Sequence, residues 1–70
     1  MKTSYTAIIQ RDGEWWIGWV EEIPGVNSQE RTRDELLESL KSALSEALEM
    51  NRAEALAVAK GPYEEVSISA

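Results

Sequence analysis

The segment IPGVNSQ at residues 23–29, followed by TRDE at residues 32–35, marks where a strand gives way to a turn and then to a helix. The proline fixes its own φ and has no N–H to donate, and the glycine can take a positive φ, so the pair ends a strand and starts a turn. Thr32 and Glu35 have the Thr-x-x-Glu spacing of a capping box, which satisfies free N–H groups at the start of a helix. The sequence therefore predicts a strand before this turn and a helix that begins at Arg33.

Two strands are predicted ahead of the turn and one after it. Residues 4–10 are rich in β-branched and aromatic side chains, and residues 15–22 begin with the run WWIGWV. Asp12-Gly13 lies between them and predicts a type I′ hairpin, because both central positions of that turn need a positive φ. Residues 26–30 are mostly polar, which favours a short third strand at the edge of the sheet.

Beyond the cap, leucine and alanine recur at helical spacing and predict one buried helix face. That face consists of Leu36, Leu37, Leu40, Ala43, Leu44, Ala47 and Leu48. Asn51 and Glu54 repeat the cap spacing, so we expect a break near residues 50–51 and a second short helix over residues 52–59. A single bent helix through residue 59 is the alternative, because this segment is rich in alanine.

The last segment is predicted to return to the sheet. Gly61-Pro62 is expected to end the helix. Residues 63–69 alternate apolar and polar side chains with period two, as in a strand with one solvent-exposed face. The expected fold class is α+β: an antiparallel β-meander with one long helix packed on one face, a short second helix and a C-terminal strand. Residues 1–70 are expected to form a single domain.

Composition excludes several functions. The chain has 13 acidic and 7 basic residues, a formal charge of −6, no cysteine and no histidine. The negative charge disfavours direct binding to nucleic acid and suits a basic protein partner, although an acidic surface also simply keeps a small protein soluble. A serine nucleophile would lack a conventional base, and no thiolate metal site is possible. No secretory signal or bilayer-length apolar run is visible, so a cytoplasmic location and no membrane contact are expected.

The aromatic strand is apolar on both of its faces. Alternation places Trp16, Gly18 and Val20 on one face and Trp15, Ile17 and Trp19 on the other. Because Gly18 would let a helix approach closely, the first face is assigned to the core. The second face is then a predicted contact surface for a partner or for another copy of the chain. Alternatively, the second short helix or the C-terminal tail folds over it.

Acidic residues at the ends of this strand complete the candidate interface. Glu21 and Glu22 follow the strand and Glu14 precedes it; they either meet basic groups of a partner or are solvated charges. The candidate partner or oligomer interface is Trp15, Ile17, Trp19, Glu21 and Glu22.

No catalytic, cofactor-binding or metal-binding residue is predicted. Metal-dependent nucleases of the ribonuclease H type hold their metal ions between clustered carboxylates. Here residues 6–9 of the first strand carry no acid, and Asp12 is accounted for by its turn. Glu64 and Glu65 are adjacent and would point to opposite sides of a strand. We therefore expect a protein that is not an enzyme.

The order of an aromatic strand, a Pro-Gly turn, a polar strand and a Thr-capped helix resembles the HicB-like antitoxin family over roughly residues 5–50. The resemblance implies a partial ribonuclease-H-like fold in a prokaryotic type II toxin–antitoxin system. It implies an antitoxin that binds and blocks a small, basic, mRNA-cleaving HicA-type toxin. The alternative is an orphan HicB-like domain that self-associates in a structural or regulatory role without a toxin.

The chain departs from the family at several positions and is expected to lack a second domain. Glu21, Glu30 and Leu36 stand where the family often has proline, glycine and alanine. The second, DNA-binding domain of many members has no counterpart here, so operator binding is not implied. A homo-oligomer, a dimer or tetramer, is expected because a chain of 70 residues has a small core.

Overall fold

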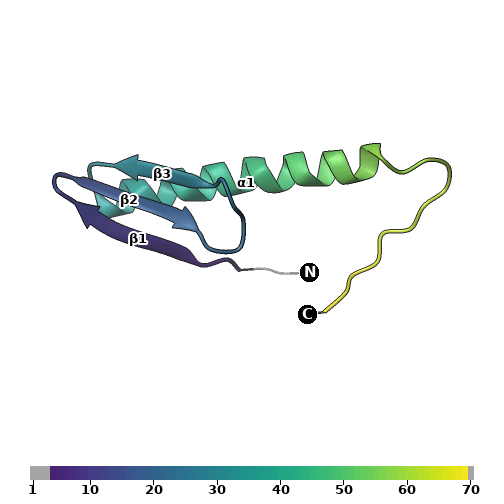
Figure 1. The fold of residues 1–70 in the computed structure, drawn as a ribbon, viewed down its shortest axis with the longest axis horizontal. Coiled ribbons are helices and arrows are strands. Elements are labelled where there is room, and N and C mark those ends of the chain that lie inside the picture. Colours follow the sequence, from purple (N-terminus) through teal and green to yellow (C-terminus); the bar gives the residue numbers. More distant parts are fainter. Residues whose placement is uncertain (1–3, 70) are drawn as a thin grey trace.

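The computed structural model describes residues 4–69, which form a three-stranded antiparallel sheet followed by one long helix (Figure 1). The elements are β1 (Ala7–Asp12), β2 (Trp15–Val20), β3 (Asn27–Glu30) and α1 (Arg33–Ala57). The strands lie in the order β1-β2-β3, so the aromatic strand is the central one. The expected α+β class and the meander are confirmed.

The first hairpin is centred one residue later than the sequence suggested. Asp12 pairs with Trp15, so the two loop residues are Gly13 and Glu14 rather than Asp12 and Gly13. Among the described residues only glycines have a positive φ, and Gly13 has φ 61°. A positive φ at the first loop position alone is the requirement of a type II′ turn, so the type I′ prediction was wrong.

The second turn lies where it was predicted. β2 ends at Val20, two residues before the expected limit, and Gly25 takes φ 91° beside Pro24. The backbone N–H of Val20 donates to the carbonyl of Val26 at 3.0 Å, which closes the loop before β3. β1 likewise begins at Ala7 rather than at residue 4.

The start of α1 agrees with the predicted cap. Thr32 is extended, with φ −126° and ψ 158°, and its Oγ1 accepts from the N–H of Glu35 at 3.2 Å. The hydroxyl of Thr32 also donates to Oε1 of Glu35 at 2.9 Å. The two side chains therefore hold each other at the point where the helix leaves the sheet, and Arg33 is its first residue.

The predicted break and second helix are absent. α1 continues without interruption through residues 50–51 and ends at Ala57 after 25 residues. The segment contains no glycine or proline, and its alanines, leucines and glutamates all favour helix, so the weaker capping tendency of Asn51 does not prevail. The single-helix alternative is the correct one, except that the helix stops two residues before residue 59.

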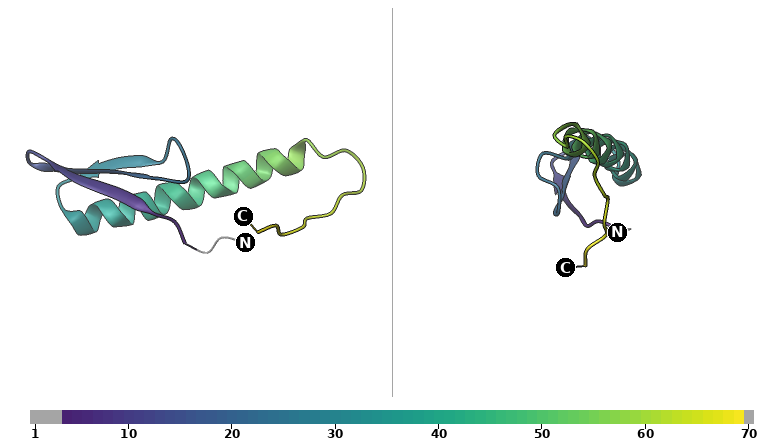
Figure 2. Two further views of the ribbon diagram at one scale, coloured as in Figure 1. Left: turned by 60° about the horizontal axis from the view of Figure 1, so that its bottom comes forward. Right: turned by 90° about the vertical axis from the view of Figure 1, so that its right-hand side faces the viewer.

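The predicted C-terminal strand is also absent. Residues 63–69 pair with no strand of the described structure and are exposed throughout. Figures 1 and 2 show the tail turning back beyond the far end of α1 without joining the sheet. A strand is stabilised by hydrogen bonds to a neighbour, and residues 63–69 form no such ladder within the described part of the chain. An ion pair between Arg52 and Glu65, at 3.5 Å, ties the tail to the last turns of α1 instead.

The core lies between the sheet and the first half of α1. Val20, Val26, Leu36 and Leu40 are at most 5% exposed, and Leu36 is completely buried. Half-buried apolar side chains surround them: Tyr5, Ile9, Trp16, Ile23, Ala43, Leu44 and Ala47. The prediction that Trp16, Gly18 and Val20 face the core is therefore confirmed.

Gly18 is the point of closest approach between the sheet and the helix. A Cβ atom on Gly18 would lie 3.1 Å from Cδ1 of Leu40 and 2.9 Å from the carbonyl oxygen of Ile8. The second distance is shorter than real Cβ contacts, so any larger residue would force the backbone apart. The absence of a side chain is what lets Leu40 reach the middle of the sheet.

We expect Gly18→Ala to lower the free energy of unfolding by about 1–3 kcal/mol, because the methyl group overpacks this contact. The loss should outweigh the stabilisation of about 0.4–1 kcal/mol that alanine brings by restricting the unfolded chain. Urea denaturation followed by circular dichroism measures the change. A midpoint equal to or above that of the unsubstituted chain would show that the helix does not pack closely at Gly18.

Candidate functional site

One face of the sheet has no helix over it. α1 packs on the face that carries Gly18, and the tail runs beside the far end of α1 (Figure 2). Trp15 and Trp19 on the opposite face are 37% and 39% exposed, and Ile17 between them is half-buried. We call these three residues the tryptophan face. Neither alternative cover, a second helix or the tail, lies on it.

At the centre of the tryptophan face the neighbours on both flanking strands are uncharged, whereas Asp12 of β1 is opposite Trp15. On β1, Ile8 is opposite Trp19 and Gln10 is opposite Ile17. On β3, Asn27 is opposite Trp19 and Gln29 is opposite Ile17. A central apolar strip with amide side chains around it combines contact area with hydrogen-bonding groups, as in protein-binding surfaces.

Trp15 is held at the hairpin end of this face. The guanidinium of Arg31 lies over its ring, 4.3 Å from the ring centroid, and the same guanidinium pairs with Oε2 of Glu14 at 3.2 Å. Both charged side chains are well exposed, so the ion pair itself adds little stability. Its effect is to restrict the rotamer of Trp15. The Glu14 carboxylate therefore has a local partner.

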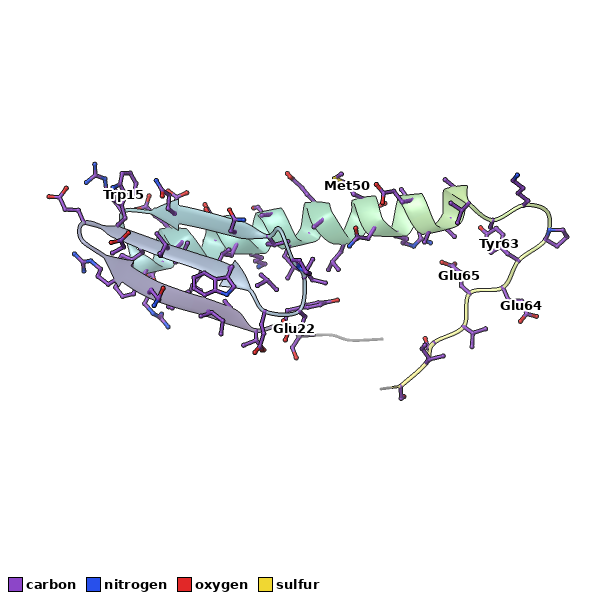
Figure 3. All side chains as sticks on the ribbon, in the orientation of Figure 1. Trp15, Glu22, Met50, Tyr63, Glu64 and Glu65 are labelled. Atoms are coloured by element: carbon purple, nitrogen blue, oxygen red, sulfur yellow. The ribbon has the colours of Figure 1, made fainter. Side chains whose placement is uncertain are left out.

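Glu22 makes a hydrogen bond within the fold. Its carboxylate accepts the backbone N–H of Thr6 at 2.8 Å, while the N–H of Glu21 donates to the carbonyl of Thr6 at 2.8 Å. These bonds extend the pairing of β1 with β2 beyond the ends of both strands. Figure 3 shows Glu22 at the opposite end of the sheet from Trp15. Of the two predicted acids, Glu21 is the one whose side chain is exposed.

An acidic groove was not predicted from the sequence. It runs between β3 and α1, has a volume of about 650 Å³, and includes five carboxylates and no basic residue in its lining. The lining residues are Glu30, Asp34, Glu35, Glu38, Ser39, Ser42, Ala43 and Glu46. Asp34, Glu38 and Glu46 are spaced by four and eight positions, which places them on one side of a helix. This spacing is the sequence signal from which the groove could have been predicted.

The acids of the groove have local roles as well. Oε2 of Glu30 accepts from Oγ of Ser39 at 2.6 Å, and Glu35 belongs to the helix cap. Within residues 4–69, no three or more histidine, cysteine or acidic side chains are arranged to hold a metal ion. The groove is therefore a negatively charged surface that attracts positively charged groups.

No helix in the described part of the chain has the length and apolar character needed to cross a membrane.

No protein-family model matches the chain, and comparisons with curated proteins and with solved structures give no match either. What the chain binds must therefore be inferred from its own surfaces.

We expect Arg31→Ala to release the ring of Trp15. Loss of the cation–π contact should cost about 0.5–1 kcal/mol of stability and shift the indole N–H signal of Trp15 in a ¹H–¹⁵N NMR spectrum. Arg33→Ala is the matched control, because it removes an exposed arginine two residues away that stacks on no indole ring within residues 4–69. Equal spectra for the Arg31 variant and the unsubstituted chain would contradict the stacking.

Proposed function

We propose that this chain is a HicB-like antitoxin that binds a small, basic, HicA-type mRNA-cleaving toxin through its tryptophan face. The observation that carries the proposal is the uncovered sheet face, on which two indoles are each more than a third exposed. Buried tryptophans are the side chains that most often dominate the energy of a protein interface. The sequence resemblance supplies the identity of the partner and the partial ribonuclease-H-like fold.

Charge supports a basic partner. The chain carries a formal charge of −6, and the acidic groove lines one edge of the same sheet beside β3. A toxin that binds RNA must itself present a basic surface. The negative charge of this chain and the positive charge of the toxin would therefore attract each other and speed association. The tryptophan face would contribute most of the binding free energy, and the surrounding acidic side chains would orient the bound toxin. We place this interaction in the cytoplasm, where mRNA is cleaved.

The second candidate is an orphan HicB-like domain that self-associates through the tryptophan face. The observation in its favour is the absence of charge at the centre of that face, where Gln10, Asn27 and Gln29 adjoin Ile17 and Trp19. Two such surfaces could meet about a two-fold axis without burying a charge. The two candidates differ in whether a partner protein displaces the second copy.

The test uses a HicA-type toxin encoded beside this chain, purified with its catalytic histidine replaced. We expect tight binding by calorimetry, and we expect Trp19→Ser to weaken it by at least about thirtyfold, as for a central interface tryptophan. Val58→Ser is the control, because Val58 is 78% exposed and lies just after the far end of α1. An unchanged affinity for Trp19→Ser would place the interface elsewhere, and a chain with no toxin partner would favour the orphan domain.

We also expect the chain to cleave no RNA. It has no histidine or cysteine, and its acidic side chains in the hairpin and in the tail lie at opposite ends of the molecule (Figure 3). Incubation of the purified chain with RNA and Mg²⁺ measures this directly. Reproducible cleavage that disappears in Asp12→Ala would refute the prediction.

A further inference from the structure

The register of the sheet brings an arginine onto the tryptophan face at its hairpin end. Trp16 of β2 is opposite Glu30, the last residue of β3, so the next position of the same register sets Arg31 opposite Trp15. Side chains of directly opposite residues lie on the same face of a sheet. The guanidinium of Arg31 accordingly lies over the ring of Trp15, 4.3 Å from its centroid.

The backbone that carries Arg31 is fixed on both sides. Glu30, which precedes it, ends β3, and Thr32, which follows it, is the cap of α1. The guanidinium also pairs with Oε2 of Glu14 in the hairpin turn at 3.2 Å. Three segments of the chain therefore meet at Trp15: the start of β2, the hairpin turn and the connection from β3 to α1. An arginine with two such partners has fewer rotamers than a free one.

Trp19, at the other end of the face, has no such neighbour. The residues opposite it are Ile8 and Asn27, and neither carries a charge. Within residues 4–69, no arginine or lysine lies over its ring. The two indoles are almost equally exposed, at 37% for Trp15 and 39% for Trp19. The difference between them is therefore not how much of the ring is exposed but whether a charged group holds it.

We propose that Arg31 is a positioning residue, which presets the ring of Trp15 in the orientation that meets the toxin. This role concerns how the tryptophan face binds and therefore rests on the proposed function. Ordering a free side chain on binding lowers affinity, and a side chain already ordered in the free protein avoids that loss. Arg31 covers one face of the ring and leaves the rest to the partner. Trp15 is then the rigid anchor of the surface, and Trp19 is the adaptable one.

Simple electrostatics predicts the opposite effect of removing Arg31. The chain has a formal charge of −6, and the proposed toxin is basic. Loss of one positive charge from this chain increases the attraction and should tighten binding. Loss of a preset ring should weaken it. The sign of the change in affinity therefore separates a positioning role from a charge effect.

The first test is a double-mutant cycle, with calorimetry against the toxin whose catalytic histidine is replaced. We expect Arg31→Ala to weaken binding by about three- to tenfold, which is the order expected for one freed side chain. In a Trp15→Ala background the same substitution should have little effect, because no ring is left to position. Arg31→Lys should restore part of the affinity, since an ammonium group can also lie over the ring.

Arg33→Ala is the matched control for charge. It removes the same positive charge from an exposed arginine that stacks on no indole ring within residues 4–69. Its affinity for the toxin should equal or slightly exceed that of the unsubstituted chain. Arg31 is exposed as well, so neither variant should unfold the chain, and backbone NMR chemical shifts check this.

The second test needs no toxin. The ¹H–¹⁵N heteronuclear NOE of an indole N–H falls when the ring moves on the picosecond to nanosecond timescale. In the free chain, we expect a value for Trp15 close to that of the β2 backbone. Arg31→Ala should lower it clearly, and Arg33→Ala should leave it unchanged.

Four results would overturn the inference. The first is toxin binding by Arg31→Ala that equals or exceeds that of the unsubstituted chain. The second is an equal loss in the Trp15→Ala background, which would show that Arg31 contacts the toxin directly. The third is an indole of Trp15 that is as mobile in the unsubstituted chain as in Arg31→Ala. The fourth is an ordered Trp15 in a chain that binds no HicA-type toxin, which would overturn the proposed function and this role with it.

Discussion

The close packing of Leu40 against Gly18 is the contact on which the rest of the structure depends. A helix can lie over the middle of a three-stranded sheet because the central strand has no side chain where the two elements meet. The buried residues Val20, Val26, Leu36 and Leu40 gather around this point. Once the helix occupies that face, the alternation of the strand turns Trp15, Ile17 and Trp19 to the other side. The exposed indoles are thus a consequence of where the glycine stands.

A chain with one sheet and one helix can cover only part of its apolar surface. The helix covers a single face, so the opposite face and the last third of the chain retain apolar groups in contact with water. Exposed apolar surface of this kind commonly marks a contact with another molecule.

Local rules predicted the parts of the fold that depend on neighbouring residues. The turn at Pro24-Gly25, the cap at Thr32 and the two faces of β2 follow from a few adjacent residues each, and the structure agrees with all three. The break at residues 50–51 failed because a capping tendency competes with continuous helix propensity. The strand over residues 63–69 failed because alternation cannot say whether an edge is within reach. Two further features depend on segments that are far apart in the sequence and could not be predicted locally: the hydrogen bond between Glu22 and Thr6, and the acidic groove where β3 meets α1.

The sheet packs one face against the helix and leaves the other open to solvent. The most direct measurement is the broadening of the three indole N–H signals of the free chain by a soluble paramagnetic agent. We expect strong broadening for Trp15 and Trp19 and much weaker broadening for Trp16, which packs against the core. Protection of Trp15 and Trp19 in the free chain, to the same degree as Trp16, would contradict it, because the tryptophan face would then already be covered.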